Sequence, residues 1–436
     1  MRQPYRIESI TLKEVGVFEH THIDFPQIKS EEQDEKKAEI HIFTGPNGCG
    51  KSTVLYALAG IFDPSLKNDV ILRKRFTSLD NKISFRFNSE GGYYGLKGER
   101  RAKDAAVFSE LLLDYHFNTQ KYDESKEHKF NFAAFAYSGQ KMEKDEFSDL
   151  SIEAITDSPF LQALSFEDSV RPYTLAQWIA SVITKAALAR SDNEEDEAVN
   201  YELAINRVRQ FIIEVCELSI SLHLDRKKLN VYLKVDEQHL DFDVLPEGLK
   251  SIFSWIADLA MKLERLHWNK KGDIFSQPII LFLDEVDIHL HPKWQRRILP
   301  AIQKLLPNAQ VFVSTHSPFV VGSVEDAYVY RLPEPRRDIC RDPSVAETIT
   351  AVDSKAGKSY QYILAEVFGV DEEFDVETEK QLTQFRELIR RHLLSQQYED
   401  QISLLADVLS IKGEELSAIV SLELRQMQRL LAKKQG

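Results

Sequence analysis

The feature that most constrains this chain is a glycine-rich segment that follows a short apolar run near the N-terminus. The segment, GPNGCGKST at residues 45–53, fits the pattern G-x-x-x-x-G-K-[ST] without a mismatch. The preceding AEIHIF predicts a buried strand, and STVLYAL predicts the start of a helix. Strand, glycine-rich loop and helix in this order form a phosphate-binding loop, because the glycines let successive backbone N–H groups point at phosphates. The chain is therefore expected to bind a nucleotide at the edge of a parallel sheet.

The pattern also assigns chemistry to individual residues of this loop. Lys51 would reach the β and γ phosphates, and Ser52 would ligate Mg²⁺. The residues expected to contact the nucleotide are Gly45, Asn47, Gly48, Gly50, Lys51, Ser52 and Thr53.

A second segment, IILFLDEVDIHLHPKW, ends an apolar run in two carboxylates. Such a run predicts a strand buried on both faces, whose carboxyl end meets the phosphate-binding loop at the same edge of the sheet. Asp284 is expected to hold Mg²⁺, and Glu285 to act as the general base for the attacking water. A third run, AQVFVSTHSP, predicts a neighbouring strand that brings His316 to the γ-phosphate.

Two further features near these strands have alternative explanations. FNFAAFAYSGQ predicts a strand that would bring Gln140 to Mg²⁺ or to water, although a polar strand end explains this residue equally well. His289 and His291 form a His-x-His pair, but zinc binding needs a third ligand, and none follows at a recognisable spacing. A polar pair on a loop is the favoured interpretation.

Composition narrows the classes of partner. The net charge of −14 argues against a generally basic surface for nucleic acid. DNA would need a local patch at residues 73–75 or 97–103, and solvated loop charge is the favoured alternative for both. The three cysteines are widely spaced and predict reduced thiols. No apolar run is long enough to span a bilayer and the N-terminus lacks a signal-peptide core, so a cytoplasmic protein without a membrane partner is expected.

The segments GPNGCGKST, LFLDEVDIHLHP and STHSP together resemble the ABC-type ATPase heads of the RecF, SMC and RecN group. Within it they look most like ATPase subunits of anti-phage systems, namely PARIS AriA and Septu PtuA, and the ATPase half of OLD-type nucleases. The resemblance implies that two heads sandwich ATP and Mg²⁺, with the signature motif of one head closing over the nucleotide of the other.

The matching signature is LPEGLKS at residues 245–251, which makes Gly248 and Ser251 candidate nucleotide contacts. Two positions depart from the family pattern. Pro246 stands where serine is usual, and Gly16 stands where a basic residue is usual. Proline offers neither a hydroxyl nor an N–H group, so slow or conditional hydrolysis is expected.

The expected fold class is α/β, an ABC-type P-loop ATPase head with a mixed sheet, a helical insertion and a helical C-terminal tail. Residues 1–150 would form the lobe with the phosphate-binding loop, and 151–240 a helical insertion with further strands. Residues 241–350 would carry the signature, the acidic pair and His316. Residues 351–436 would form a helical domain for assembly or effector contact, and no buried strand there ends in the paired acids that a fused TOPRIM nuclease needs.

Two functions from different classes fit these expectations. The favoured one is a sensor or scaffold ATPase of an anti-phage system that forms homo-oligomers, responds to a phage-encoded trigger and controls a separately encoded effector such as a TOPRIM or HNH nuclease. The alternative is a RecF-like DNA-repair ATPase that clamps DNA. A nucleotide-binding scaffold that barely hydrolyses ATP is a third reading, because of Pro246.

Overall fold

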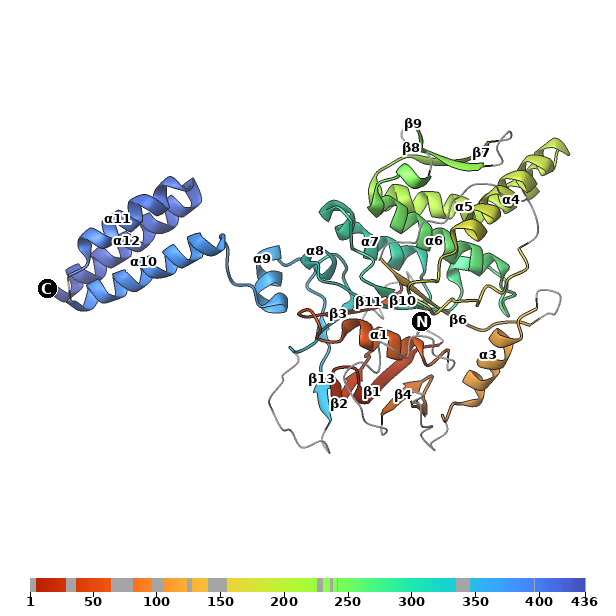
Figure 1. The fold of residues 1–436 in the computed structure, drawn as a ribbon, viewed down its shortest axis with the longest axis horizontal. Helices are drawn as coiled ribbons and strands as arrows, with labels where there is room; N and C mark the ends of the chain where they lie inside the picture. The colour runs from red at the N-terminus through yellow and green to blue at the C-terminus, as the bar shows by residue number, and fades with distance from the viewer. Residues whose placement is uncertain are drawn as a thin grey trace. The chain divides into compact units, whose positions relative to one another are not determined.

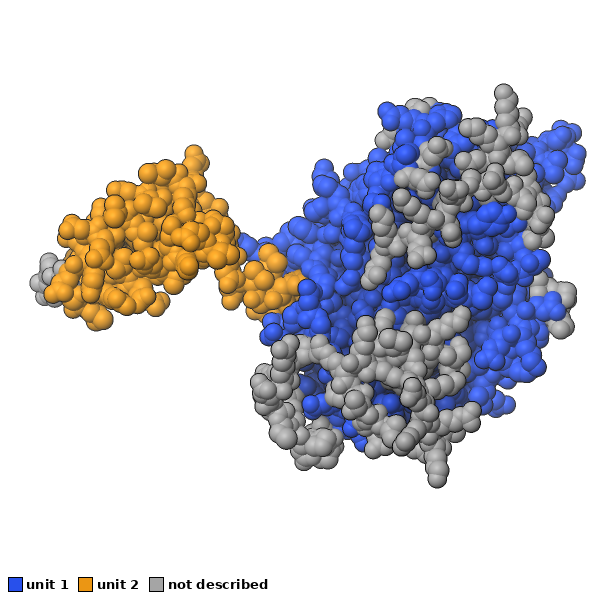
Figure 2. Space-filling model, in the orientation of Figure 1, with its two compact units in different colours: residues 1–363 blue, residues 364–436 orange. Residues whose placement is uncertain are grey.

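The computed structural model separates the chain into two compact units, residues 1–363 and 364–436 (Figure 2). It describes residues 5–28, 37–63, 81–95, 106–123, 128–139, 155–225, 230–235, 238–240, 242–334, 346–395 and 397–435. Residues 73–75 and 97–103, which sequence analysis considered for DNA contact, lie outside this part, as does Gln140. Within the described residues, no helix is long and apolar enough to cross a membrane.

A six-stranded sheet forms the centre of the first unit (Figure 1). In spatial order its strands are β14 (Val352–Asp353), β12 (Ala327–Arg331), β3 (Glu39–Thr44), β11 (Ala309–Ser314), β10 (Ile279–Asp284) and β6 (Ala133–Ser138). Five strands are parallel and β14 is antiparallel, which confirms the expected mixed sheet. Every residue of β3, β10 and β11 is buried, as continuous apolar strands covered on both faces require.

The second compact unit does not begin at residue 351, where the sequence predicts a domain boundary. Val352 of β14 pairs with Val329 of β12, so this short strand belongs to the central sheet, and the second unit begins only at Leu364. A strand of two residues is too short to show a hydrophobic period. Its partner, not its own sequence, determines where it belongs.

A second sheet covers the phosphate-binding helix. Its strands, in spatial order, are β13 (Glu347–Ile349), β2 (Phe18–Asp24), β1 (Ile7–Val15), β4 (Lys82–Phe87) and β5 (Glu90–Tyr94). Helix α1 (Lys51–Ala59) contacts β10 and β11 of the central sheet, and its Ala57 carbonyl accepts a hydrogen bond of 2.5 Å from the Tyr94 hydroxyl of the second sheet. Helix α1 is therefore held between the two sheets, which explains why eight of its nine residues are buried.

Buried polar side chains join the two sheets beside β3. The Arg6 guanidinium, just before β1, lies 2.7 Å from Glu39 at the start of β3. The Gln310 amide of β11 donates to the same carboxylate at 2.7 Å and to the Ile7 carbonyl at 2.9 Å. These contacts pair a charge that would otherwise be costly to bury, and they fix the strand that leads into the phosphate-binding loop.

Helices cover the other face of the central sheet (Figure 1). They are α4 (Pro172–Ser191), α5 (Glu195–Cys216), α6 (Glu247–Arg265) and α7 (Pro292–Leu305). A small sheet of β7 (Ile220–Asp225), β8 (Asn230–Val235) and β9 (Gln238–Leu240) precedes α6. Other short elements among the described residues of this unit are α3 (Glu110–Gln120), α8 (Pro318–Val321), α9 (Tyr360–Ile363) and the 3₁₀ turns at Phe242–Val244 and Ile274–Ser276.

The second unit is helical, as expected. After a π-helical turn at Leu364–Phe368 it contains α10 (Val376–Ser395), α11 (Glu399–Ile411) and α12 (Glu414–Gln435). Apolar residues at helical spacing form its own core, and they are Leu382, Phe385, Leu388, Ile389, Ile402, Ala406, Leu409, Val420 and Met427. A separate core of this kind explains why the unit is compact by itself.

Candidate functional site

The predicted phosphate-binding residues, except Gly45, line a cavity of about 350 Å³ at the carboxyl edge of the central sheet. The loop between β3 and α1 forms one wall, and the ends of β10 and β11 bring Glu285 and His316 to the opposite side. The residues that line it are Gly16, Val17, Asn47, Gly48, Gly50, Lys51, Ser52, Thr53, Glu285 and His316. Val17 was missed, since nothing in the local sequence shows that the turn between β1 and β2 reaches this cavity.

Glycine is required in the loop for conformational reasons. Gly45, Gly48 and Gly50 have φ angles of 146°, 77° and 100°, a region that L-residues avoid. A Cβ atom on Gly45 would also lie 2.6 Å from the Leu332 carbonyl oxygen. The loop can therefore turn its N–H groups inward only with glycine at these positions.

The Lys51 side chain closes the loop. It is 5% exposed, and its ammonium donates to the carbonyl oxygens of Gly45 and Pro46 at 3.1 and 3.2 Å. The charge is thereby held at the mouth of the loop, where a phosphate group would replace the two carbonyl oxygens as its partner.

Asp284 and Ser52 are in contact and together offer oxygen ligands for a metal ion. The Ser52 hydroxyl donates to Asp284 Oδ1 at 3.1 Å, and the Ser314 hydroxyl donates to the same oxygen at 2.5 Å. Burial raises the pKa of Asp284, which the two hydroxyl hydrogen bonds partly offset. A carboxylate and a hydroxyl beside a phosphate-binding loop are the hard oxygen ligands that Mg²⁺ prefers, so the donor set fits this ion.

Glu285 and His316 lie next to each other in the wall of the cavity. The His316 Nε2 atom lies 3.6 Å from Glu285 Oε1. Burial, followed by the charge of Lys51, lowers the pKa of His316, which favours the neutral imidazole at pH 7. Glu285 has a φ of 52°, which is unusual for a residue with a side chain. Neighbouring residues must therefore hold the backbone of Glu285 in the conformation that directs its carboxylate into the cavity.

Asp287 is a buried acid that sequence analysis did not select. Its Oδ2 atom accepts a hydrogen bond of 2.8 Å from the Thr315 hydroxyl, whereas its buried Oδ1 atom has no partner among the described residues. Burial raises the pKa of Asp287 to about 6. Its position two residues after Glu285 was the available signal, but only the fold shows that this acid turns inward.

The other predicted contacts lie elsewhere or outside the described residues. Gly248 and Ser251 stand near the start of α6 and do not line this cavity. Any contact with a nucleotide bound by another copy therefore stays a prediction, as does the role of Gln140. The His291 Nδ1 atom accepts a hydrogen bond of 3.2 Å from the Lys293 N–H group and so caps α7. This contact gives His291 a structural role.

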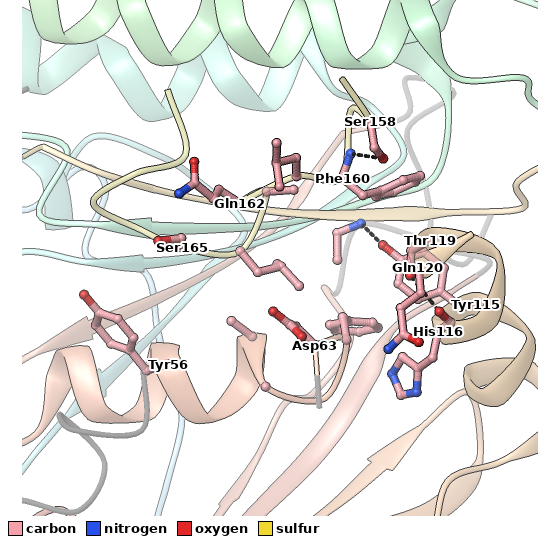
Figure 3. A pocket seen from close by; sticks show the side chains of 17 residues that line it. Tyr56, Asp63, Tyr115, His116, Thr119, Gln120, Ser158, Phe160, Gln162 and Ser165 are labelled. Carbon is pink, nitrogen blue, oxygen red and sulfur yellow. Dashed lines mark hydrogen bonds between the residues drawn. The ribbon is translucent and has the colours of Figure 1, made fainter. Parts of the chain in front are cut away.

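A second cavity, of about 450 Å³, lies at the opposite end of α1 (Figure 3). It is bounded by the end of α1, by α3 and by residues 158–165, and aromatic rings such as Tyr115 and Phe160 form part of its wall. Asp63 is among its lining residues. A helix C-terminus and a carboxylate both disfavour phosphate, so this cavity does not suit the phosphate groups of a nucleotide.

Several characterised proteins have similar sequences. The "Retron Ec83 probable ATPase" of Escherichia coli is 30% identical over 184 residues, which cover 40% of this chain and 32% of that protein. The chain thus spans about a third of that relative. The "Septu protein PtuA" of Bacillus thuringiensis is 21% identical over 345 residues, which cover 76% of this chain and 79% of that protein.

Among solved structures, an SMC head bound to the C-terminal winged-helix domain of ScpA is 12% identical, covers 80% of this chain and 97% of its own, and has a TM-score of 0.41. The recombination mediator protein RecF is 11% identical, covers 80% of this chain and 99% of its own, and has a TM-score of 0.39. One family model matches residues 40–322, which include the phosphate-binding loop, the acidic pair and His316. Because this match extends over more than half of the chain, the protein belongs to the P-loop ATPase family described as "AAA domain, putative AbiEii toxin, Type IV TA system".

Proposed function

We propose that the protein is an ATP-hydrolysing sensor or scaffold subunit of an anti-phage defence system, which forms homo-oligomers and controls a separately encoded nuclease. The observation that carries the proposal is that Lys51, Ser52, Glu285 and His316 line one cavity, with Asp284 in contact with Ser52. The similarity to retron and Septu proteins supports the defence setting.

Each side chain has a distinct task in the proposed hydrolysis. Lys51 and the loop N–H groups bind the phosphates, and Ser52 and Asp284 hold Mg²⁺, which would offset the negative charge on the transferred phosphoryl group. The Glu285 carboxylate orients a water molecule and accepts its proton. A neutral His316 donates a hydrogen bond to the γ-phosphate through its Nε2 atom. Without a nucleotide, the same atom contacts Glu285.

The second unit supports a role in assembly or effector contact. It has its own core, and yet it exposes large apolar side chains: Val376 is 84% exposed, Leu394 83%, Leu404 70%, Ile411 86% and Leu422 67%. Large apolar side chains exposed on a small helical unit are available to bind another protein. We infer that this surface joins copies of the chain or holds the nuclease.

Mass photometry of the Glu285→Gln protein tests the proposal, with and without ATP and Mg²⁺, and with the product of the neighbouring gene. We expect a homo-oligomer that captures that product. Lys51→Ala is the matched control, because it should not bind ATP. A monomer that dimerises with ATP, ignores its neighbour and binds DNA would overturn the proposal in favour of a DNA-repair ATPase.

A further inference from the structure

The segment that carries the proposed general base has an unusual backbone. Both Glu285 and His289 have positive φ angles, 52° and 65°, although neither is glycine. Residues with a Cβ atom avoid this region, so the conformation persists only where neighbouring structure holds it. The backbone conformation of residues 285–289 therefore determines where the Glu285 carboxylate points.

One side of the segment is held by the end of β6. The Gly139 N–H group donates to the Asp284 carbonyl at 2.9 Å. A Cβ atom at Gly139 would lie only 2.1 Å from the Glu285 carbonyl oxygen, which is far closer than atoms of this kind can approach. The backbone of β6 therefore packs directly on the backbone of Glu285, and only glycine permits this contact.

The other side is held by the first turn of α6. A Cβ atom at Gly248 would lie 2.7 Å from the His289 carbonyl oxygen. Gly248 is thus in contact with the same segment at its far end, within its own chain. Two glycines, one just after strand β6 and one in helix α6, enclose residues 285–289.

A buried cluster connects the strand to the helix. The Tyr137 hydroxyl, two residues before Gly139, donates to Asp258 Oδ2 on α6 at 2.8 Å. The Lys262 ammonium, one helical turn further along, lies 2.6 Å from the same oxygen and donates to the Ser169 carbonyl at 2.8 Å. Tyr137, Asp258 and Lys262 are 0%, 1% and 2% exposed. A charged pair this deeply buried is costly unless it is fully paired, and an apolar pair would fill the same space.

We propose that Tyr137, Asp258 and Lys262 are positioning residues for ATP hydrolysis: they fix β6 against α6 and so hold Gly139 and Gly248 in contact with segment 285–289. The proposal depends on the proposed function in one respect, since it takes Glu285 as the general base. None of the three residues lines the phosphate-binding cavity. It acts by holding the backbone that aims the Glu285 carboxylate.

Two substitutions of different severity test this role in the full-length protein. Gly139→Ala should displace the Glu285 carbonyl and lower kcat on the order of a hundredfold, as a misplacement of about 1 Å does. Tyr137→Phe removes only one hydroxyl and should lower kcat about tenfold, the equivalent of one hydrogen bond. The Kd of a fluorescent ATP analogue should stay unchanged in both, because the phosphate-binding loop is intact. Thermal unfolding verifies that each variant is folded.

Gly91→Ala is the matched control, because an added Cβ atom at this strand glycine would have no neighbour within 4 Å. It should hydrolyse ATP at the parent rate. If Gly139→Ala does not fold, Tyr137→Phe decides. Parent kcat in the folded variants overturns the inference, and so does a loss of ATP affinity that accounts for the whole fall in rate.

Glu285→Gln separates failure of this inference from failure of the proposed function. If Glu285→Gln hydrolyses ATP at the parent rate, the proposed function fails whatever the other variants do. If Glu285→Gln is slow and retains ATP while Tyr137→Phe and Gly139→Ala keep the parent kcat, the inference alone fails. Slow turnover in all three, with intact ATP binding, supports both.

Discussion

The two units of the chain treat polar and apolar side chains in opposite ways. The first unit buries charged groups beside its sheet edge, among them Asp284, Asp258 and Lys262, and gives each of them a hydrogen-bond partner. The second unit buries a small apolar core and leaves Leu404 and Ile411 largely exposed. Burial of charge is costly and is kept where chemistry or positioning needs it, whereas exposed apolar area favours contact with another protein. The comparison is consistent with the proposal that the first unit carries catalysis and the second carries association.

The largest expected effect tests the chemistry of the first unit. Glu285→Gln should lower kcat by about 10²–10⁴-fold, the range that a positioned general base contributes, because the amide cannot accept the proton of water. ATP binding should be retained, since the phosphate-binding loop is unchanged. Steady-state hydrolysis and equilibrium ATP binding measure the two effects. Lys51→Ala, as the control, should lose binding as well; a Gln variant that also lost binding would contradict the assigned role.

A substitution in the core of the second unit should destabilise that unit and leave hydrolysis by the first unit unchanged. Phe385 is 0% exposed, and Phe385→Ala should destabilise that unit by about 3–5 kcal/mol, the usual cost of such a truncation. Chemical denaturation followed by circular dichroism would report the loss. Hydrolysis by the first unit should continue at the parent rate per molecule. A proportional fall in kcat would show that the units are not independent.

The stability of the first unit should depend on pH through Asp287. Its pKa is raised from 3.8 to about 6 by burial, so the folded protein binds this proton more tightly than the unfolded chain. The resulting stability is fully present below pH 3.8 and is lost as the pH rises through about 6. Asp287→Asn cannot ionise. Over this pH window the parent should lose about 3 kcal/mol of stability that the variant keeps.

Denaturant unfolding of parent and Asp287→Asn proteins at several pH values, in metal-free buffer, measures this difference. The variant should become more stable relative to the parent as the pH rises. A difference in stability that does not vary with pH would exclude Asp287 as the titrating group. The transition of the second unit should be the same in both proteins.

The smallest effect on stability should accompany a loss of association. Leu404→Ser and Ile411→Ser change exposed positions, so each should alter stability by less than about 0.5 kcal/mol. Both should reduce oligomer formation or capture of the neighbouring gene product in mass photometry. Leu188→Ser, at a 60% exposed position of the first unit, is the matched control and should leave association intact. Equal losses from all three would argue against a specific surface.

The sequence predicted the site where local pattern and chemistry coincide. The loop at residues 45–53 and the strand that ends in Asp284 and Glu285 are continuous segments, so their roles could be inferred from residue type and spacing. The helices of the second unit followed from apolar period for the same reason. The second compact unit begins at Leu364 and not at residue 351, because a strand as short as β14 is assigned by its partner.

The sequence by itself determined the nucleotide chemistry of this protein, since a phosphate-binding loop requires its glycines, lysine and serine within a few consecutive positions. Only the tertiary structure decided how Glu285, the proposed general base, is held. Gly139 and Gly248 lie more than a hundred residues apart, and both contact one five-residue segment only because β6 pairs with β10 and α6 packs on the same sheet edge. Contacts of this kind depend on which strands become neighbours, and no local pattern encodes that choice.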